Sequence, residues 1–196
     1  MSEPLSREQA WDLFRTWTES ESLRRHVLAV EAAMRAYAER FGSDVEQWGL
    51  VGMLHDLDYE RYPDLETGHP RMALEELERL GFSSELVRAV ASHADALEVS
   101  RDSPMEKALF AVDELSGFIM ACAYVRPTGI HGLTPKSVKK KMKTPAFAAA
   151  VNRDELREGA EHLGIDFDEH LAFVIAALEA ESDVLELNGS EPAQAG

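Results

Sequence analysis

The sequence predicts an all-α protein, an irregular bundle of roughly eight to ten helices with no sheet. Apolar residues recur at three- and four-residue steps along most of the 196-residue chain, which is the spacing of one helix face. Residues that start helices and glycines that end them separate these stretches at short intervals. No stretch alternates apolar and polar residues for more than a few positions, so no strand is expected.

The segments with the helical pattern are 6–20, 22–41, 43–56, 69–80, 84–94, 104–125, 134–144, 152–163 and 168–187. The first opens with a capping box of Ser6 and Gln9. The second stops at Gly42, a residue suited to a helix C-terminus. The third opens with a second capping box, Ser43 with Glu46. Each of these boundaries therefore has a local chemical cause.

The later helices have similar boundary signals. A loop rich in Asp, Pro and Gly occupies 58–68, after which Pro70 suits the first helical position and Gly81 the stop. Ser103 and Glu106 form a capping box around a first-turn proline. The connections are mostly short, as expected for helices that pack on their neighbours.

Composition predicts a single domain over 1–187 and a flexible tail over 188–196. Within the domain we expect a metal-binding core at about 22–125, followed by a basic helix and C-terminal helices over 126–187. The net charge of −16 argues against nucleic acid or an anionic membrane as a partner. No long apolar run and no leader pattern are seen, so a cytoplasmic protein is expected. The single cysteine, Cys122, excludes a disulfide framework, and a homodimer is left open.

One segment has the opposite charge. Its lysines are Lys136, Lys139, Lys140, Lys141 and Lys143. Such a run is either a solvated helix face or an element that attracts an anionic substrate toward an acidic protein.

Polar side chains interrupt apolar helix faces or stand at helix ends at six positions, which are His26, His55, Asp56, His69, His93 and Asp113. A single buried histidine is usually a hydrogen-bonded core residue. Six such positions in one small domain favour a common cause, because burying a carboxylate requires a counter-charge, hydrogen bonds or a metal. His131, His162 and His170 lie in loops or among charged residues and are left out.

Four imidazoles and two carboxylates suit Fe, Mn, Co, Ni or Zn, and Mg suits a carboxylate-rich position. One or two ions are expected, and two explain the number of ligands better because one catalytic ion needs open positions. The first would use His26, His55 and Asp113, and the second His69 and His93, with Asp56 bridging. Gly49 and Gly52 on the third helix predict that the helix carrying His26 packs close to it.

The order His, His-Asp, His, His, Asp resembles the HD-domain superfamily of metal-dependent phosphohydrolases, specifically its dinuclear members. The resemblance covers about 22–125 and is most similar to the bacterial HD domain-containing hydrolases, including 108–117 and the Val-Arg-Pro at 125–127. It implies an HD-type helical fold and hydrolysis of a phosphomonoester or phosphoanhydride of a small molecule, such as a nucleotide, by metal-activated water. Asp56 and Asp58 are the expected catalytic carboxylates.

The sequence departs from the family pattern after His-Asp. Many members continue with an apolar residue, Gly and Lys, whereas here Leu57, Asp58 and Tyr59 follow. A phosphate contact from that lysine is therefore absent, and the substitutes that we consider are Lys107, Arg126, Lys136, Lys140 and Lys143. Asp58 is interpreted either as a general acid or base beside the metal or as an exposed turn carboxylate.

Two other functions are compatible with the same residues. Some dinuclear HD-type proteins are mixed-valent diiron oxygenases, which would require oxygen. A non-catalytic metal-stabilised module would retain the metal without turnover.

Overall fold

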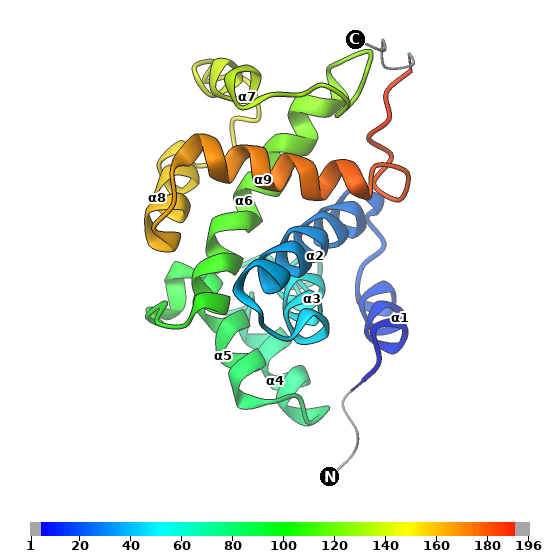
Figure 1. Cartoon of the computed structure of the whole chain (residues 1–196). Helices are drawn as coiled ribbons and strands as arrows, with labels where there is room; N and C mark the ends of the chain where they lie inside the picture. Colours follow the sequence, from blue (N-terminus) through cyan, green and yellow to red (C-terminus); the bar gives the residue numbers. More distant parts are fainter. Residues whose placement is uncertain (1–4, 191–196) are drawn as a thin grey trace. The chain divides into compact units, whose positions relative to one another are not determined.

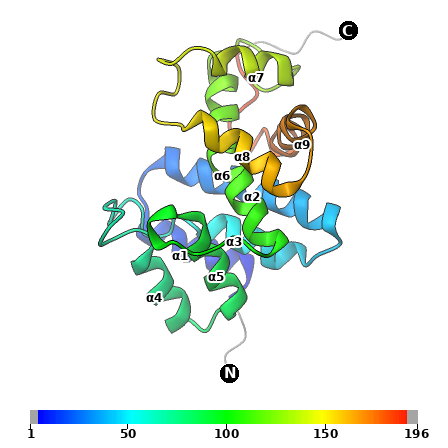
Figure 2. The ribbon, with the colours of Figure 1, turned by 90° about the vertical axis from the view of Figure 1, so that its left-hand side faces the viewer.

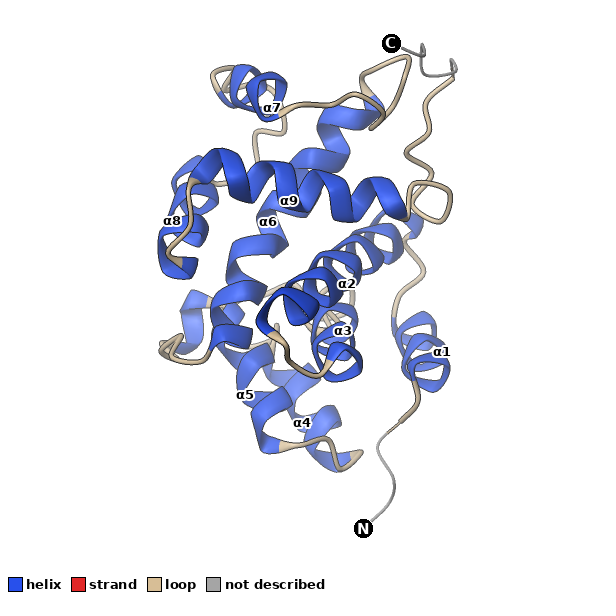
Figure 3. Ribbon diagram, viewed as in Figure 1, coloured by secondary structure: helices blue, strands red, loops and turns tan. Residues whose placement is uncertain are grey.

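A computed structural model of the chain describes residues 5–190. Its regular elements in that range are nine α-helices and one short 3₁₀ helix (Figure 1). They are α1 (Arg7–Trp17), α2 (Glu21–Phe41), α3 (Val45–Leu54), α4 (Arg71–Arg79), α5 (Ser84–His93), η1 (Asp95–Leu97), α6 (Pro104–Tyr124), α7 (Pro135–Met142), α8 (Arg153–Leu163) and α9 (Phe167–Ala180). No strand occurs among residues 5–190 (Figure 3), so the predicted all-α fold is confirmed.

Several predicted boundaries coincide with the observed ones. The Ser6 and Gln9 capping box starts α1, and Gly42 ends α2 in the left-handed conformation. At the start of α6, the Ser103 hydroxyl accepts from the Glu106 N–H at 3.2 Å, and the Glu106 carboxylate accepts from the Ser103 N–H at 2.8 Å. Local side-chain to backbone hydrogen bonds therefore set these helix ends.

The predicted capping box at the third helix is wrong by one residue. Asp44, not Ser43, is the N-cap of α3, and its carboxylate accepts from the Gln47 N–H at 3.0 Å. Glu46 instead pairs with the guanidinium of Arg35 on α2, at 2.6 Å. The ion pair between helices therefore removes Glu46 from the capping role.

Three other boundaries also differ from prediction. Pro70 is the N-cap of α4 rather than its first residue. Helix α9 ends at Ala180 rather than at 187. The predicted tail is held at its start, because Asn188 hydrogen bonds His131 at 2.9 Å and the Ser190 N–H donates to a loop carbonyl. The rest of that tail, 191–196, lies outside the described residues.

The chain divides into two compact units, Met1–Phe110 and Ala111–Gly196, with the boundary inside α6. The expectation of one domain with its metal-binding core at 22–125 stays a prediction.

In the first unit, α2 and α3 pack along each other, and α3 also contacts α1 and α5. A Cβ added at Gly52 would come within 2.9 Å of the Glu31 backbone on α2, so the predicted close approach is confirmed. Glu31 is almost fully buried and pairs with Arg7 of α1 at 2.6 Å and with Arg35 at 2.9 Å. Because both guanidinium groups bond it, its buried charge is compensated.

In the second unit, α7 and α8 each pack on α9, and Figure 2 shows α8 beside α9. His170 of α9 is fully buried, and its Nε2 donates to the Ala111 carbonyl at 3.0 Å. The sequence analysis left this histidine out because charged residues adjoin it in the chain, and the structure shows that it is nevertheless a buried helix residue. Cys122 is buried as expected, and burial raises the pKa of its thiol to about 11. None of the helices in residues 5–190 combines the length and apolar character that a membrane crossing requires.

Candidate metal centre

The end of α3 places the central residues of the site. Every residue from Trp48 to Leu54 is buried, and the helix stops at Leu54 with His55 as its C-cap. His55 is fully buried, and Asp56 follows it with only 8% exposure. A polar pair thus occurs where an apolar helix ends inside the protein, and it needs compensation there.

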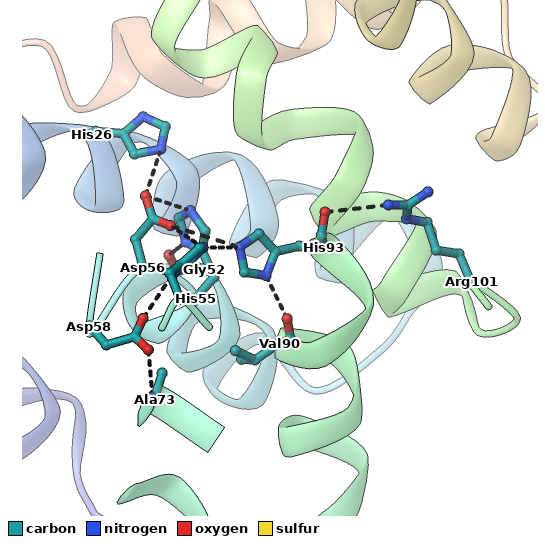
Figure 4. Close-up of polar contacts among 10 residues, drawn as sticks. His26, Gly52, His55, Asp56, Asp58, Ala73, Val90, His93 and Arg101 are labelled. Carbon is teal, nitrogen blue, oxygen red and sulfur yellow. Dashed lines mark hydrogen bonds and ion pairs between the residues drawn. The ribbon is translucent and has the colours of Figure 1, made fainter. Parts of the chain in front are cut away.

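Histidines from three other segments surround Asp56 (Figure 4). His26 comes from α2, His69 from the turn before α4, and His93 from the last position of α5. His69 is 3% exposed, and His93 is largely buried. The sequence therefore predicted five residues that the fold brings into one cluster.

The Asp56 carboxylate divides the histidines into two pairs. Its Oδ2 lies 3.8 Å from His26 Nε2 and 3.5 Å from His55 Nε2. Its Oδ1 lies 3.4 Å from His69 Nε2 and 3.8 Å from His93 Nε2. In each of the resulting groups, His26–His55–Asp56 and Asp56–His69–His93, the possible ligand atoms all lie within 4.8 Å of one another.

Backbone carbonyls fix two of the imidazole rings. His55 Nδ1 lies 2.7 Å from the Gly52 carbonyl, and His93 Nδ1 lies 2.5 Å from the Val90 carbonyl, in each case three residues back in the same helix. A carbonyl only accepts, so each Nδ1 carries the proton. The Nε2 lone pair of each neutral ring is then directed toward Asp56, as in metal-ligating histidines.

His69 and His93 give a further reason to expect a cation. Their Nε2 atoms are only 3.0 Å apart. Two neutral rings with protonated Nδ1 atoms would face each other with two lone pairs, which repel. A shared proton or a cation removes the repulsion, so these residues fit a divalent ion bound through imidazole nitrogen and carboxylate oxygen.

Asp58 corrects one of our interpretations. It is fully buried, not an exposed turn residue. Its Oδ1 accepts from His69 Nδ1 at 2.7 Å, and its Oδ2 accepts from the Ala73 N–H at 2.8 Å. Because both oxygens are held, the geometry makes Asp58 a positioning residue that orients His69, and its expected role as a general acid or base stays a prediction.

Arg101 is a supporting residue that the sequence did not reveal. Its guanidinium lies over the Phe110 ring, 3.8 Å from the centroid. It donates to the carbonyls of Ser92 at 2.9 Å and His93 at 3.3 Å, and it pairs with Asp95. Arg101 thus fixes the end of α5 that carries His93 (Figure 4). Arg101 lies in a loop and bonds carbonyls eight and nine residues earlier in the chain. Such contacts follow no periodic sequence pattern, so the sequence could not predict them.

The structure places the remaining predicted residues elsewhere or leaves them untested. Asp113 is half-buried on α6 in the second unit, and its role as a ligand stays a prediction. Lys107 is half-buried in the first unit. The exposed lysines Lys136, Lys140 and Lys143 belong to α7 and its C-cap in the second unit, and their substrate contacts also stay predictions.

Arg126 is engaged within the loop after α6, and its contact with a substrate stays a prediction. Its Nε donates to the Gly129 carbonyl at 2.9 Å, and one terminal nitrogen donates to the His131 carbonyl at 2.9 Å and the Thr128 hydroxyl at 3.1 Å. These bonds close the loop after α6, so Arg126 stabilises the fold.

Comparison with known proteins gives one family match and one relative. Residues 23–117 match the family model described as HD domain, and this segment contains all six predicted ligands. Among curated proteins, the chain is similar to Ribonuclease Y from Rhodopirellula baltica, with 27% identity over 135 residues. The alignment covers 69% of this chain but only 24% of the relative. No solved structure matches the chain.

Proposed function

The chain carries an HD domain over residues 23–117, and on that premise we propose that it is a metal-dependent phosphohydrolase acting on a small phosphorylated molecule. The observation that carries the proposal is the Asp56 carboxylate, which has two imidazole Nε2 atoms near each oxygen. A single buried aspartate in this position can serve two ions at once.

We assign the first ion to His26, His55 and Asp56, with Asp113 as a further proposed ligand. The second ion would be held by Asp56, His69 and His93. The donor set suits Fe, Mn, Co, Ni or Zn, with Mg as an alternative. Such ions, when bound, supply an activated water and neutralise phosphate charge.

The protein's own residues orient this ligand set. The Gly52 and Val90 carbonyls hold the rings of His55 and His93, so that little reorganisation accompanies binding. The buried Asp58 carboxylate holds the His69 ring in the same way, and its negative charge makes His69 Nε2 a stronger metal ligand. Asp56 is the residue on which both halves of the site depend.

Two observations favour a phosphomonoester or phosphoanhydride of a small molecule as the substrate. The matched family is the HD domain, and the resemblance to it implies metal-dependent phosphohydrolase chemistry. The net charge of −16 disfavours a long polyanion such as RNA. We propose Lys107, Lys136, Lys140 and Lys143 as contacts for the phosphate; Lys107 forms no ion pair among residues 5–190.

The test is metal analysis of protein purified without chelators, combined with phosphate release from a panel of phosphorylated metabolites. Phosphate release that persists without oxygen and is lost in Asp56→Asn protein supports the proposal. Activity that requires oxygen would instead indicate a diiron oxygenase. A protein that retains stoichiometric metal and converts nothing would indicate the non-catalytic module.

A further inference from the structure

The segment that joins Asp58 to His69 exposes large apolar side chains next to the metal centre. Tyr59, Tyr62 and Leu65 are 44%, 43% and 52% exposed. Ligand sites combine a few polar groups with apolar and aromatic walls, so an exposed aromatic ring beside a buried polar cluster is a candidate contact for a ligand.

The two tyrosines differ in what they contact. The Tyr59 ring lies perpendicular to the His69 ring with 5.1 Å between centroids, and the Tyr59 N–H donates to the Asp56 carbonyl at 3.1 Å. The Tyr62 ring instead contacts Trp17, with 6.4 Å between centroids. Tyr59 therefore borders the metal centre, whereas Tyr62 anchors the segment to α1.

The residues after Tyr59 are held in place. The Glu60 carboxylate accepts from the Glu19 N–H at 3.1 Å and the Ser20 N–H at 2.9 Å. The Arg61 guanidinium lies 5.0 Å from the Trp17 ring centroid and donates to a carbonyl at the end of α1. The backbone that follows Tyr59 is thus held and the Tyr59 ring packs against His69, which reduces the entropy that binding costs.

We propose that Tyr59 is a specificity-determining residue that stacks on the aromatic base of a nucleotide whose phosphate is held at the metal centre. The binding of the phosphate at the metal centre rests on the proposed function, whereas the stacking of the base rests on the position and exposure of Tyr59. A neutral aromatic ring offers no charge to a phosphate, but it offers a face that any base can stack on. Its contact with His69 places that ring beside one of the proposed ligands.

The test compares wild type with Tyr59→Phe and Tyr59→Leu in Mn²⁺-loaded protein. Binding of adenosine and uridine is measured by calorimetry, and kcat/KM is measured for adenosine 5′-monophosphate and ribose 5-phosphate. Loss of stacking should weaken nucleoside binding about 5- to 100-fold in Tyr59→Leu, with a matching fall for the nucleotide through KM. Tyr59→Phe should behave like wild type, and ribose 5-phosphate should change less than about twofold.

Tyr62→Leu is the matched control, because Tyr62 has nearly the same exposure in the same segment but its ring contacts Trp17 rather than the His69 ring. The Tyr62 carbonyl that accepts from the His69 N–H belongs to the backbone and is kept in this variant. It should leave nucleoside binding unchanged. Metal content, measured on every variant, should be equal, since the proposed role is contact with the base and not support of His69.

Three results would overturn the inference: no nucleoside binding to wild type, equal losses for the nucleotide and ribose 5-phosphate, or a loss in Tyr59→Phe as large as in Tyr59→Leu. The inference and the proposed function fail separately. Nucleoside binding that depends on Tyr59, in a protein that releases no phosphate, would refute only the function. Hydrolysis that is indifferent to Tyr59 would refute only the inference.

Discussion

His55 and His170 are both fully buried, one in each compact unit, yet their ring nitrogens have different partners. In His170 the Nε2 atom donates to the Ala111 carbonyl. In His55 the Nδ1 atom is held by a carbonyl, and Nε2 is directed toward Asp56. Burial therefore does not distinguish a histidine that only stabilises the fold from one that we propose as a metal ligand, whereas the identity of the ring nitrogen held by the backbone does.

His131 extends the contrast. Both of its ring nitrogens are engaged by side chains of the second unit, Nδ1 by Glu179 at 3.0 Å and Nε2 by Asn188 at 2.9 Å. These bonds are typical of a histidine that links a loop to a helix and a C-terminal segment. The four predictions below test whether the two kinds of histidine differ in function as they do in geometry.

The largest effect is expected from Asp56→Asn, because Asp56 belongs to both ligand groups. Losing a shared ligand should reduce metal affinity by more than the roughly 10–100-fold that outer-shell changes cause, and turnover should be abolished. Metal titration followed by calorimetry checks the first part. Asp12→Asn is the control, since that exposed carboxylate pairs with Arg15 in its own helix. Retained turnover in metal-loaded Asp56→Asn protein would refute the mechanism.

Substitution of His55 should change metal binding, whereas substitution of His170 should change the stability of the folded state. His55→Gln is expected to lower metal content per chain, because the ring that directs Nε2 toward Asp56 is removed. His170→Leu is expected to cost about 1–3 kcal/mol of unfolding free energy, since the Ala111 carbonyl loses a buried donor, and to leave metal content unchanged. Denaturant unfolding and elemental analysis provide the two measurements. Similar metal loss in both variants would remove the distinction.

A smaller effect is expected when only the support of a ligand is changed. In Asp58→Asn one amide oxygen replaces two carboxylate oxygens, so the side chain can accept from only one of the His69 ring and the Ala73 N–H, and the negative charge is lost. Metal affinity should fall by about 10–100-fold, with the folded state retained. Asp95→Asn, which changes an exposed partner of Arg101, should have little effect. A metal affinity equal to that of wild type would show that Asp58 does not orient His69.

The smallest effect concerns His131 and appears only as a dependence on pH. Hydrogen bonds that the His131 ring donates to the Glu179 carboxylate and the Asn188 side-chain oxygen raise the pKa of His131 above its ordinary value of 6.5. Protonated His131 therefore stabilises the folded state fully below about pH 6.5, and this contribution is lost as the pH rises through the raised pKa. The difference in Tm between wild type and His131→Gln should thus be larger at pH 5.5 than at pH 9. A difference that is the same at both values would contradict this assignment.

The sequence predicted the helices and five members of the cluster because their signals are local. Periodicity, capping residues and a His-Asp pair at the end of an apolar run can all be recognised within a few residues. The bonds from His55 to Gly52 and from His93 to Val90 also had a local signal, a histidine at a helix C-terminus.

The missed features depend on residues far apart in the chain. Asp58 is held by residues 11 and 15 positions later, and its turn composition suggested exposure instead. Glu46 left its predicted cap because Arg35 of another helix pairs with it. Arg126 looked like a substrate contact from its charge alone, but it bonds the loop that follows it.

The segment from Asp56 to His69 contains two proposed ligands at its ends, the carboxylate of Asp58 that holds the His69 ring, and the exposed ring of Tyr59. The segment folds back on itself through the bond from the His69 N–H to the Tyr62 carbonyl at 2.8 Å. Its length is consequently as constrained as its composition. Inserting or deleting a single residue between Asp58 and His69 would shift the supporting carboxylate out of register with the imidazole that it holds. Related chains that retain this arrangement should tolerate indels elsewhere on their surfaces but keep this spacing constant.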